Sequence, residues 1–193
     1  MRVLVLYAHP VATSYGAALH RAALEGLREA GHDVDDCDLY AEGFDPVMSA
    51  EERAGYHDLA TNRAPVAGYV DRLLAAEGLV IVSPIWNLGH PAILKGFFDR
   101  VFLPGVTFAI RDGRLGSSAM RLKALAAVHT YGGPRGLIWL TGDPPRRVVN
   151  RLIGSLVAAG GTKRYLTLYG MNRASQRDRE TFSSKVRREM ATL

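Results

Sequence analysis

The chain has 193 residues, of which 48% are hydrophobic and 22% charged, and no apolar run approaches the ~20 residues of a membrane span, so we expect one soluble globular domain over residues 1–193. Its single cysteine, Cys37, excludes an internal disulfide and is typical of a reducing compartment, so a cytoplasmic location is expected. The net charge is +5, and the positive charge is concentrated in residues 120–193, which carry 14 Lys and Arg against 4 Asp and Glu. No nucleic-acid-binding motif accompanies this charge, so nucleic acid is not an expected partner.

The first predicted elements are a buried strand over the apolar run Val3 to Leu6 and a helix that begins after Ser14. Ser14 suits the N-cap position, and the N–H groups of Tyr15 to Ala17 would then point toward His9 and Thr13. Amides at a helix N-terminus, beside hydroxyls and an imidazole, favour a phosphate site. A lone histidine is more often a structural hydrogen-bonding residue, and the G-x-G-x-x-G dinucleotide fingerprint is absent.

The next stretch predicts an edge strand and two helices. Residues 33–39 are polar and alternate weakly, which suits a strand at the edge of a sheet. Ser49 and Glu52 form a capping-box pattern that opens a short helix, and Pro65 opens another that ends before Gly78. Together these helices form one long connection to the following strand.

The most informative stretch begins at Leu79. The unbroken apolar run Leu79 to Val82 predicts a strand buried on both faces, and the apolar spacing from Pro91 onward predicts a largely buried helix. The loop between them, Pro84 to His90, follows the carboxyl end of a central strand, where open α/β sheets bind ligands. Two interpretations remain open at this point: a ligand-binding loop, or a tight turn with Trp86 in the core.

A hairpin is predicted after this helix, because turn signals at residues 104–105 and 112–113 flank the apolar stretch Val106 to Ile110. We expect Phe108, within this hairpin, to lean over a neighbouring pocket. The remaining predicted elements are a strand over Leu122 to Val128, an amide-rich turn over Thr130 to Gly133, a helix capped by Asp143-Pro144-Pro145 and closed by Gly160-Gly161, a strand over Tyr165 to Tyr169, and a last helix opened by Ser175 and Asp178.

Five predicted strands that alternate with helices are typical of a doubly wound α/β fold with a parallel sheet. Two strand orders are common for such sheets. Only the order 2-1-3-4-5 brings the loops after strands one, three and four together at the switch point, so we predict a flavodoxin-like five-stranded parallel sheet.

Three motifs stand out in the sequence. The first is Tyr7-Ala8-His9-Pro10 with Ser14-Tyr15-Gly16-Ala17, the second is Pro84-Ile85-Trp86-Asn87-Leu88 with the helix from Pro91 to Phe102, and the third is Thr130-Tyr131-Gly132-Gly133. Through these motifs the chain resembles the flavodoxin-like NAD(P)H:quinone oxidoreductases. This family includes DT-diaphorase and bacterial quinone reductases, some of which accompany potassium-efflux systems. The resemblance implies one flavin-binding domain over residues 1–193 and an NAD(P)H dehydrogenase (quinone) activity, with ping-pong, two-electron reduction of a quinone or similar acceptor. The donor would be NADPH or NADH. FMN is favoured over FAD, because no extension like that of DT-diaphorase follows the last predicted helix.

The loops of the predicted sheet edge and the resemblance together indicate the residues of the site. Trp86, Phe108 and Tyr131 would line the substrate pocket, and no metal would be bound. No catalytic acid or base is named, because the positions that hold a Tyr and a His in DT-diaphorase fall near Ile138 and Pro144. The cofactor-binding residues would be His9, Thr13, Ser14, Tyr15, Gly16, Ala17, Pro84, Ile85, Trp86, Asn87, Leu88, Thr130, Tyr131, Gly132 and Gly133.

Other expectations concern assembly and alternative functions. The helix over residues 92–101 is apolar on more faces than one sheet can cover, which favours a homodimer. One alternative function is a flavoprotein regulatory subunit in peripheral contact with a membrane potassium-efflux transporter, and another is a flavin or azo reductase. An electron carrier like flavodoxin is disfavoured, because such carriers are usually acidic and this chain has a pI near 9.6.

Overall fold

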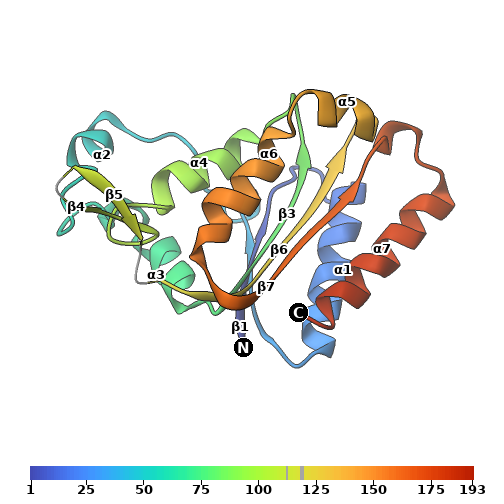
Figure 1. Cartoon of the computed structure of the whole chain (residues 1–193), viewed down its shortest axis with the longest axis horizontal. Coiled ribbons are helices and arrows are strands. Elements are labelled where there is room, and N and C mark those ends of the chain that lie inside the picture. Colours follow the sequence, from blue (N-terminus) through green and yellow to red (C-terminus); the bar gives the residue numbers. More distant parts are fainter. Residues whose placement is uncertain (112, 118–119) are drawn as a thin grey trace.

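The computed structural model describes residues 1–111, 113–117 and 120–193. Within this part of the chain, five strands form one parallel sheet with helices on both faces (Figure 1). The order of the strands along the sheet is β2-β1-β3-β6-β7. When only the strands of this sheet are numbered, this order is 2-1-3-4-5, which confirms the predicted flavodoxin-like arrangement. The strands are β1 (Arg2–Tyr7), β2 (Asp33–Asp38), β3 (Gly78–Ile85), β6 (Leu122–Tyr131) and β7 (Val157–Leu168).

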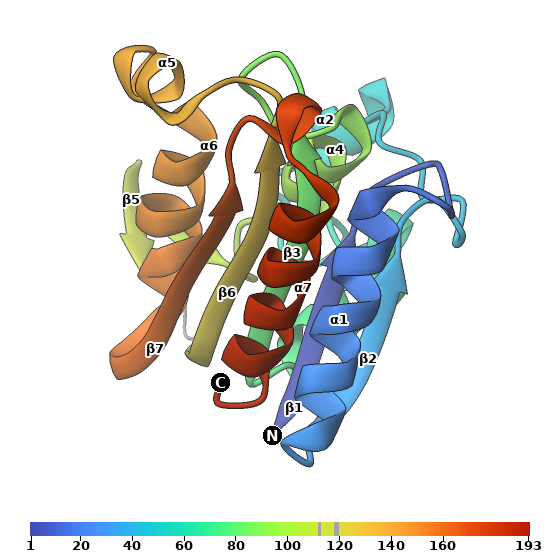
Figure 2. The same cartoon turned by 90° about the vertical axis from the view of Figure 1, so that its right-hand side faces the viewer.

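Side chains that alternate along the central strands fill an apolar layer on each face of the sheet. In β1, Val3 and Val5 pack into one layer, and Leu4 and Leu6 pack into the other. The central strands are therefore buried on both faces, which explains their unbroken apolar runs. The first layer is covered by α1 (Tyr15–Glu29) and α7 (Gln176–Met190), which lie side by side in Figure 2. The second layer is covered by α3 (Ala67–Ala75), by α4 (Ala92–Val101) and by one further helical segment. This segment consists of α6 (Pro144–Arg147), the π-helical turn η2 (Val148–Leu152) and the 3-10 turn η3 (Ile153–Leu156).

The helix starts predicted at three serines are confirmed. Ser14, Ser49 and Ser175 are the N-caps of α1, α2 (Ala50–Gly55) and α7, and each side chain accepts a hydrogen bond from a backbone N–H of the first turn. At Ser49 and Ser175 the reciprocal bond of a capping box is also present. Three further short helices are η1 (Ala64–Val66), α5 (Arg135–Leu140) and η4 (Met171–Arg173).

The predicted hairpin is confirmed as the antiparallel pair β4 (Phe108–Arg111) and β5 (Arg114–Ser117). Asp112, in the expected turn, lies outside the described residues. Figure 1 shows the hairpin next to α2, at one end of the molecule and away from the upper edge of the sheet.

Gly160 and Gly161 do not close a helix, contrary to the sequence-based expectation. Helical structure ends at Leu156 and β7 begins at once, so both glycines lie inside the strand. The pairing of β6 with β7 shifts register here, and a Cβ on Gly161 would lie 2.8 Å from the carbonyl oxygen of Lys123. The glycine pair therefore marks an irregular strand and not a helix end.

Helix α4 is covered within its own chain. Its large apolar side chains are at most 8% exposed, so they present no surface that needs a second copy, and the reason given for a homodimer is wrong. The exposed side of α4 instead carries Lys95 and Asp99, which form an ion pair. None of the helices in the described residues is both long and apolar enough to cross a bilayer. The buried apolar side chains of α4 are Ile93, Leu94, Phe97, Phe98 and Val101.

Candidate functional site

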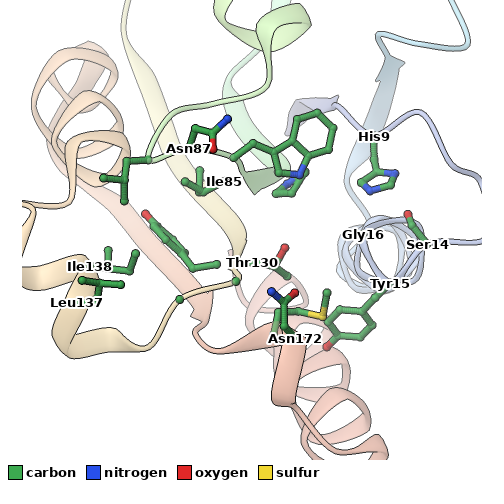
Figure 3. A pocket seen from close by; sticks show the side chains of 17 residues that line it. His9, Ser14, Tyr15, Gly16, Ile85, Asn87, Thr130, Leu137, Ile138 and Asn172 are labelled. Carbon is green, nitrogen blue, oxygen red and sulfur yellow. The ribbon is translucent and has the colours of Figure 1, made fainter.

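A cavity of about 620 Å³ lies where the carboxyl ends of β1, β3 and β6 meet (Figure 3). This is the switch point of the sheet, where β1 lies between β2 and β3. In Figure 3, His9, Ser14 and Tyr15 lie on one side of the cavity, and Leu137 and Ile138 lie on the opposite side. The lining residues are His9, Ser14, Tyr15, Gly16, Pro84, Ile85, Trp86, Asn87, Leu88, Thr130, Tyr131, Gly132, Gly133, Leu137, Ile138, Met171 and Asn172.

The first wall is the loop from β1 to α1. Ser14 Oγ accepts from the N–H of Ala17 at 3.1 Å, so its hydroxyl hydrogen remains able to donate. The N–H groups of Tyr15 and Gly16, in the first helical turn, have no acceptor within the helix. His9 Nδ1 accepts from the N–H of Val11 at 3.0 Å, so in the neutral ring Nε2 carries the proton. This wall therefore offers several hydrogen-bond donors.

Two predicted residues of this region are not at the cavity. Thr13 is exposed to solvent outside the lining, and Ala17 is buried on the side of α1 that packs into the core. Ala17 acts on the site only indirectly, because its N–H holds the Ser14 side chain.

The second wall is the turn after β3. Trp86 and Gly89 exchange both backbone hydrogen bonds, at 3.0 and 2.9 Å, around Asn87 and Leu88. Both central residues have positive φ, 50° and 60°, as a type I′ turn requires. Left-handed backbone at non-glycine residues costs about 1–2 kcal/mol each and concentrates at functional sites.

The side chain of Trp86 is exposed at this turn. It is 43% accessible and its ring meets His9 edge-on at 5.9 Å between centroids. The alternative interpretation, in which Trp86 is a core residue, is therefore wrong.

The third wall is formed by the end of β6 and the segments that cover it. A Cβ on Gly132 would lie 3.0 Å from Asn172 Nδ2, and one on Gly133 would lie 3.4 Å from Ile138 Cδ1. The absence of side chains at the two glycines therefore lets Asn172 and Ile138 pack closely against the backbone that follows β6. Sequence reasoning missed Leu137, Ile138, Met171 and Asn172, which come from α5 and η4. These helices are too short for a periodic pattern, but η4 follows the last strand at the same sheet edge.

Tyr131 holds the third wall in place through its hydroxyl. The hydroxyl donates to Asp143 Oδ1 at 2.6 Å and lies 2.8 Å from the hydroxyl of Tyr165. Burial, followed by the hydrogen bond to Asp143, raises the pKa of Tyr131, so it remains a neutral phenol. Its ring is 1% exposed and contributes an aromatic surface to the cavity.

Two buried histidines lie close to this wall. The ring centroids of His129 and His90 are 5.3 Å apart, and His129 Nδ1 lies 3.2 Å from Ser83 Oγ. Burial lowers the pKa of His129 to about 3 and that of His90 to about 4, so both are neutral near pH 7. Neither lines the cavity, whose titratable side chains are His9, Tyr15 and Tyr131.

Within one chain, and contrary to the expectation, Phe108 does not line the same cavity as Trp86 and Tyr131. Phe108 lines a second cavity of about 860 Å³, between the hairpin, α4 and η2. The hairpin follows the carboxyl end of α4, which runs antiparallel to β3 and so leads away from the sheet edge that forms the first cavity. Within one chain, the aromatic surface of the first cavity is thus provided by Trp86, Tyr131 and Tyr15.

Comparison with known proteins identifies similar sequences and structures. The family described as having a flavodoxin-like fold matches residues 1–144. The chain is 31% identical over 153 residues to the FMN-dependent NADH:quinone oxidoreductase of Bacillus pumilus, a match that covers 68% of this chain and 72% of the relative. The chain is also 32% identical over 123 residues to NAD(P)H dehydrogenase [quinone] 1 of Rattus norvegicus, and this match covers 55% of this chain and 45% of the relative.

The structural comparison covers the whole chain. The NAD(P)H:quinone oxidoreductase from Methanothermobacter marburgensis superposes with a TM-score of 0.84 and 28% identity, over 100% of this chain and 98% of that one. By sequence, the chain spans little more than half the length of several curated relatives, with 55 to 58% of the relative covered in those from Escherichia coli, Penicillium crustosum and Haemophilus influenzae.

Proposed function

Since the chain belongs to the family of proteins with a flavodoxin-like fold, we propose that it is a flavin-dependent oxidoreductase that transfers two electrons from NADPH or NADH to a quinone or similar acceptor. One observation carries this proposal. The cavity at the switch point combines an amide-rich helix N-terminus, an exposed tryptophan on a strained turn and a glycine pair, on three loops of one sheet edge. A phosphate, a flat ring and close backbone approach are the features of a ligand that such walls fit.

The residues of the three walls fit a flavin mononucleotide. Ser14 and the N–H groups of Tyr15 and Gly16 suit its phosphate, and His9, whose Nδ1 accepts from the N–H of Val11, adds a donor at Nε2. Among the residues that the structure describes, no carboxylate lines the cavity to repel a phosphate. The cavity volume of about 620 Å³ lies within the usual range for small-molecule sites, about 300 to 1,000 Å³. FMN is proposed before FAD because the Bacillus pumilus relative is named FMN-dependent.

The ring system of the flavin would lie against the other two walls. The turn from Trp86 to Gly89 presents its backbone in a fixed direction, because two hydrogen bonds close it. Gly132 and Gly133 line the cavity with backbone alone, so the ring edge could approach that backbone closely. When bound, the flavin supplies the two-electron chemistry, and the protein contributes orientation and the charge distribution around the ring.

Among the described residues, the titratable groups at or near the cavity whose pKa values are most strongly shifted are held neutral near pH 7. Tyr131 is held neutral by burial and by its bond to Asp143, and the buried His90 and His129 lie outside the lining. The side chains around the cavity therefore bind and orient, while Trp86 and Tyr131 shape a slot in which donor and acceptor bind in turn. We infer that acceptors which take their protons from solvent, as quinones can, are the preferred class.

The test is the absorption spectrum of the purified protein, the identity of the released flavin and the turnover of a quinone. We expect a yellow protein that releases FMN and gives parallel lines in double-reciprocal plots when donor and acceptor are varied. Colourless protein that takes up neither FMN nor FAD in a titration would overturn the proposal. Intersecting lines would instead show that donor and acceptor bind together.

A further inference from the structure

A third cavity, of about 400 Å³, lies between α5, α6 and the end of β7. Four arginines line it, Arg135, Arg146, Arg147 and Arg151, together with the aromatic side chains of Trp139 and Tyr169. Figures 1 and 2 show α5 at the upper end of the molecule, above α6. The sequence places this cluster in the basic part of the chain, for which the proposed function provides no role.

The positive charge in the lining of this cavity exceeds the negative charge. In the part of the chain that the structure describes, none of the four arginines forms a salt bridge, whereas Arg72 and Arg100 each bind carboxylates elsewhere. The cavity has one carboxylate in its lining, Asp143, and its Oδ1 accepts from the hydroxyl of Tyr131. Clustered guanidinium groups of this kind attract phosphate, which they can bind in a bidentate manner.

Aromatic surface is available beside these charges. Trp139 is 79% exposed, which is unusual for a side chain of this size, and Tyr169 also lines the cavity. An exposed indole next to guanidinium groups suits a ligand with both a flat base and a phosphate, because the base can stack while the phosphate is paired. A nucleotide has this combination and inorganic phosphate does not.

The arginine cavity and the candidate flavin cavity are neighbours, with the side chains of Tyr131 and Tyr169 between them. Tyr131 lines the flavin cavity, its ring lies 5.1 Å from that of Tyr169, and its hydroxyl binds Asp143. Helix α5 contributes to both sides, with Leu137 in the flavin cavity and Trp139 in the arginine cavity. Two neighbouring cavities, one suited to a reactive ring and one to a phosphate, match the two ends of a single dinucleotide.

We propose that the arginine cavity binds the phosphorylated adenosine end of the nicotinamide donor and selects the donor that carries a 2′-phosphate. The inference rests on the function proposed for the neighbouring cavity. Arginine is the side chain that accommodates the 2′-phosphate in dinucleotide sites, where an acidic residue would instead bind the free 2′-hydroxyl. The ligand is thus a nucleoside phosphate, and NADPH is preferred over NADH.

The first experiment measures binding without turnover. Adenosine 2′,5′-bisphosphate, adenosine 5′-monophosphate and inorganic phosphate are titrated into the flavin-loaded protein by calorimetry. We expect the bisphosphate to bind at least about tenfold more tightly than either of the others, because it offers both the base and the second phosphate. Equal binding of inorganic phosphate would overturn the assignment to a nucleotide, and absence of bisphosphate binding would overturn the site.

The second experiment uses the double variant Arg147→Gln/Arg151→Gln, with Arg188→Gln on α7 as a control that also removes an exposed charge. We expect the double variant to lose bisphosphate affinity by about tenfold or more, since hydrogen bonds to charged groups are among the stronger ones. Trp139→Ala should weaken the bisphosphate but leave inorganic phosphate unaffected. Thermal unfolding and flavin content serve as checks, because these side chains are exposed and their loss should not affect folding.

Steady-state kinetics separate this inference from the proposed function. The double variant should show a raised KM for NADPH with unchanged KM for NADH and unchanged kcat, because the change removes binding to one part of the donor. An active quinone reductase with identical NADPH and NADH constants in variant and parent would overturn the donor site alone. If no reductase activity is found, the calorimetric result still decides whether the arginine cavity binds a nucleotide.

Discussion

At the scale of single residues, Ser14 connects the fold with the candidate site. Its side chain caps α1 through the N–H of Ala17 and also lines the cavity. Ser49 caps α2 in the same way but lies outside the cavity lining. The two serines thus allow the contribution of a cap to be separated from the contribution of a ligand contact.

We predict that Ser14→Ala lowers the free energy of unfolding by about 1 kcal/mol and weakens flavin binding by about fivefold, through a lost cap and a lost hydrogen bond to phosphate. Ser49→Ala should lower the stability by a similar amount and leave flavin affinity unchanged. Urea denaturation and flavin titration measure the two effects. Equal flavin affinity in both variants would show that the phosphate does not lie at α1.

The buried histidines predict a pH dependence of stability. Their pKa values in the folded protein, about 3 for His129 and about 4 for His90, lie below the value of about 6.5 in an unfolded chain. Between these values the unfolded state binds protons that the folded state does not, so acid favours unfolding. Stability should therefore be fully present above about pH 6.5 and fall as the pH decreases toward about 4, by up to 1.4 kcal/mol per unit for each histidine.

Denaturation by urea at a series of pH values measures this slope. His57→Gln, at an exposed histidine, should leave it unchanged, and His90→Gln should reduce it. A stability that is constant between about pH 7 and about pH 5 would contradict the burial of the two rings in a neutral form.

At the scale of elements, the contact between α1 and α7 depends on a glycine. A Cβ on Gly26 would overlap the carbonyl oxygen of Arg187 and lie 2.9 Å from Met190 Cβ. The close approach lets α7 cover the sheet beside α1, where Phe182, Val186 and Met190 are buried. Gly68, in α3, has no atom within 4 Å of the corresponding position.

Gly26→Ala should therefore destabilise the protein by about 1–3 kcal/mol, because α7 must shift, and this outweighs the better helix propensity of alanine. Gly68→Ala should be neutral or stabilising by up to about 1 kcal/mol, because the propensity gain is not opposed by a clash. Urea denaturation of both variants compares the two effects. A stabilising Gly26→Ala would show that the two helices are not in close contact.

At the scale of the whole molecule, a homodimer remains a prediction, but on different grounds. Helix α4 is covered by its own chain, whereas the cavity beside the hairpin is lined by the half-buried Phe108 and by Leu152, which is 59% exposed. A large cavity with such accessible apolar side chains is a surface that a second copy would cover. The predicted mass is twice 21.0 kDa.

Light scattering at micromolar concentration measures this mass, and Phe108→Asp should reduce it to that of one chain. The same variant should retain bound flavin, because Phe108 lies outside the candidate flavin cavity. A parent protein of about 21 kDa at this concentration would contradict the prediction.

Local chemistry accounts for much of what the sequence predicts correctly. The apolar runs at Val3 to Leu6 and Leu79 to Val82 specify buried strands, and the serines at helix starts specify caps, because these signals act over a few neighbouring residues. The strand order also follows, since the loops after the first, third and fourth strands carry the ligand-type residues. Most of the predicted lining of the first cavity, from His9 to Gly133, comes from these loops.

Only the tertiary structure decided which distant segments complete the site. Ile138 and Asn172 enter the cavity because α5 and η4 fold back over the same sheet edge, and neither helix is long enough to show a periodic pattern. Phe108 lies outside this cavity because the hairpin packs beside α4. Gly161 lies within a strand, at a point where the backbone of Lys123 in the neighbouring strand comes too close for a side chain. The sequence by itself determined the elements and their order, whereas contacts between residues far apart in the chain, which carry no local signal, determined the complete walls of the cavity.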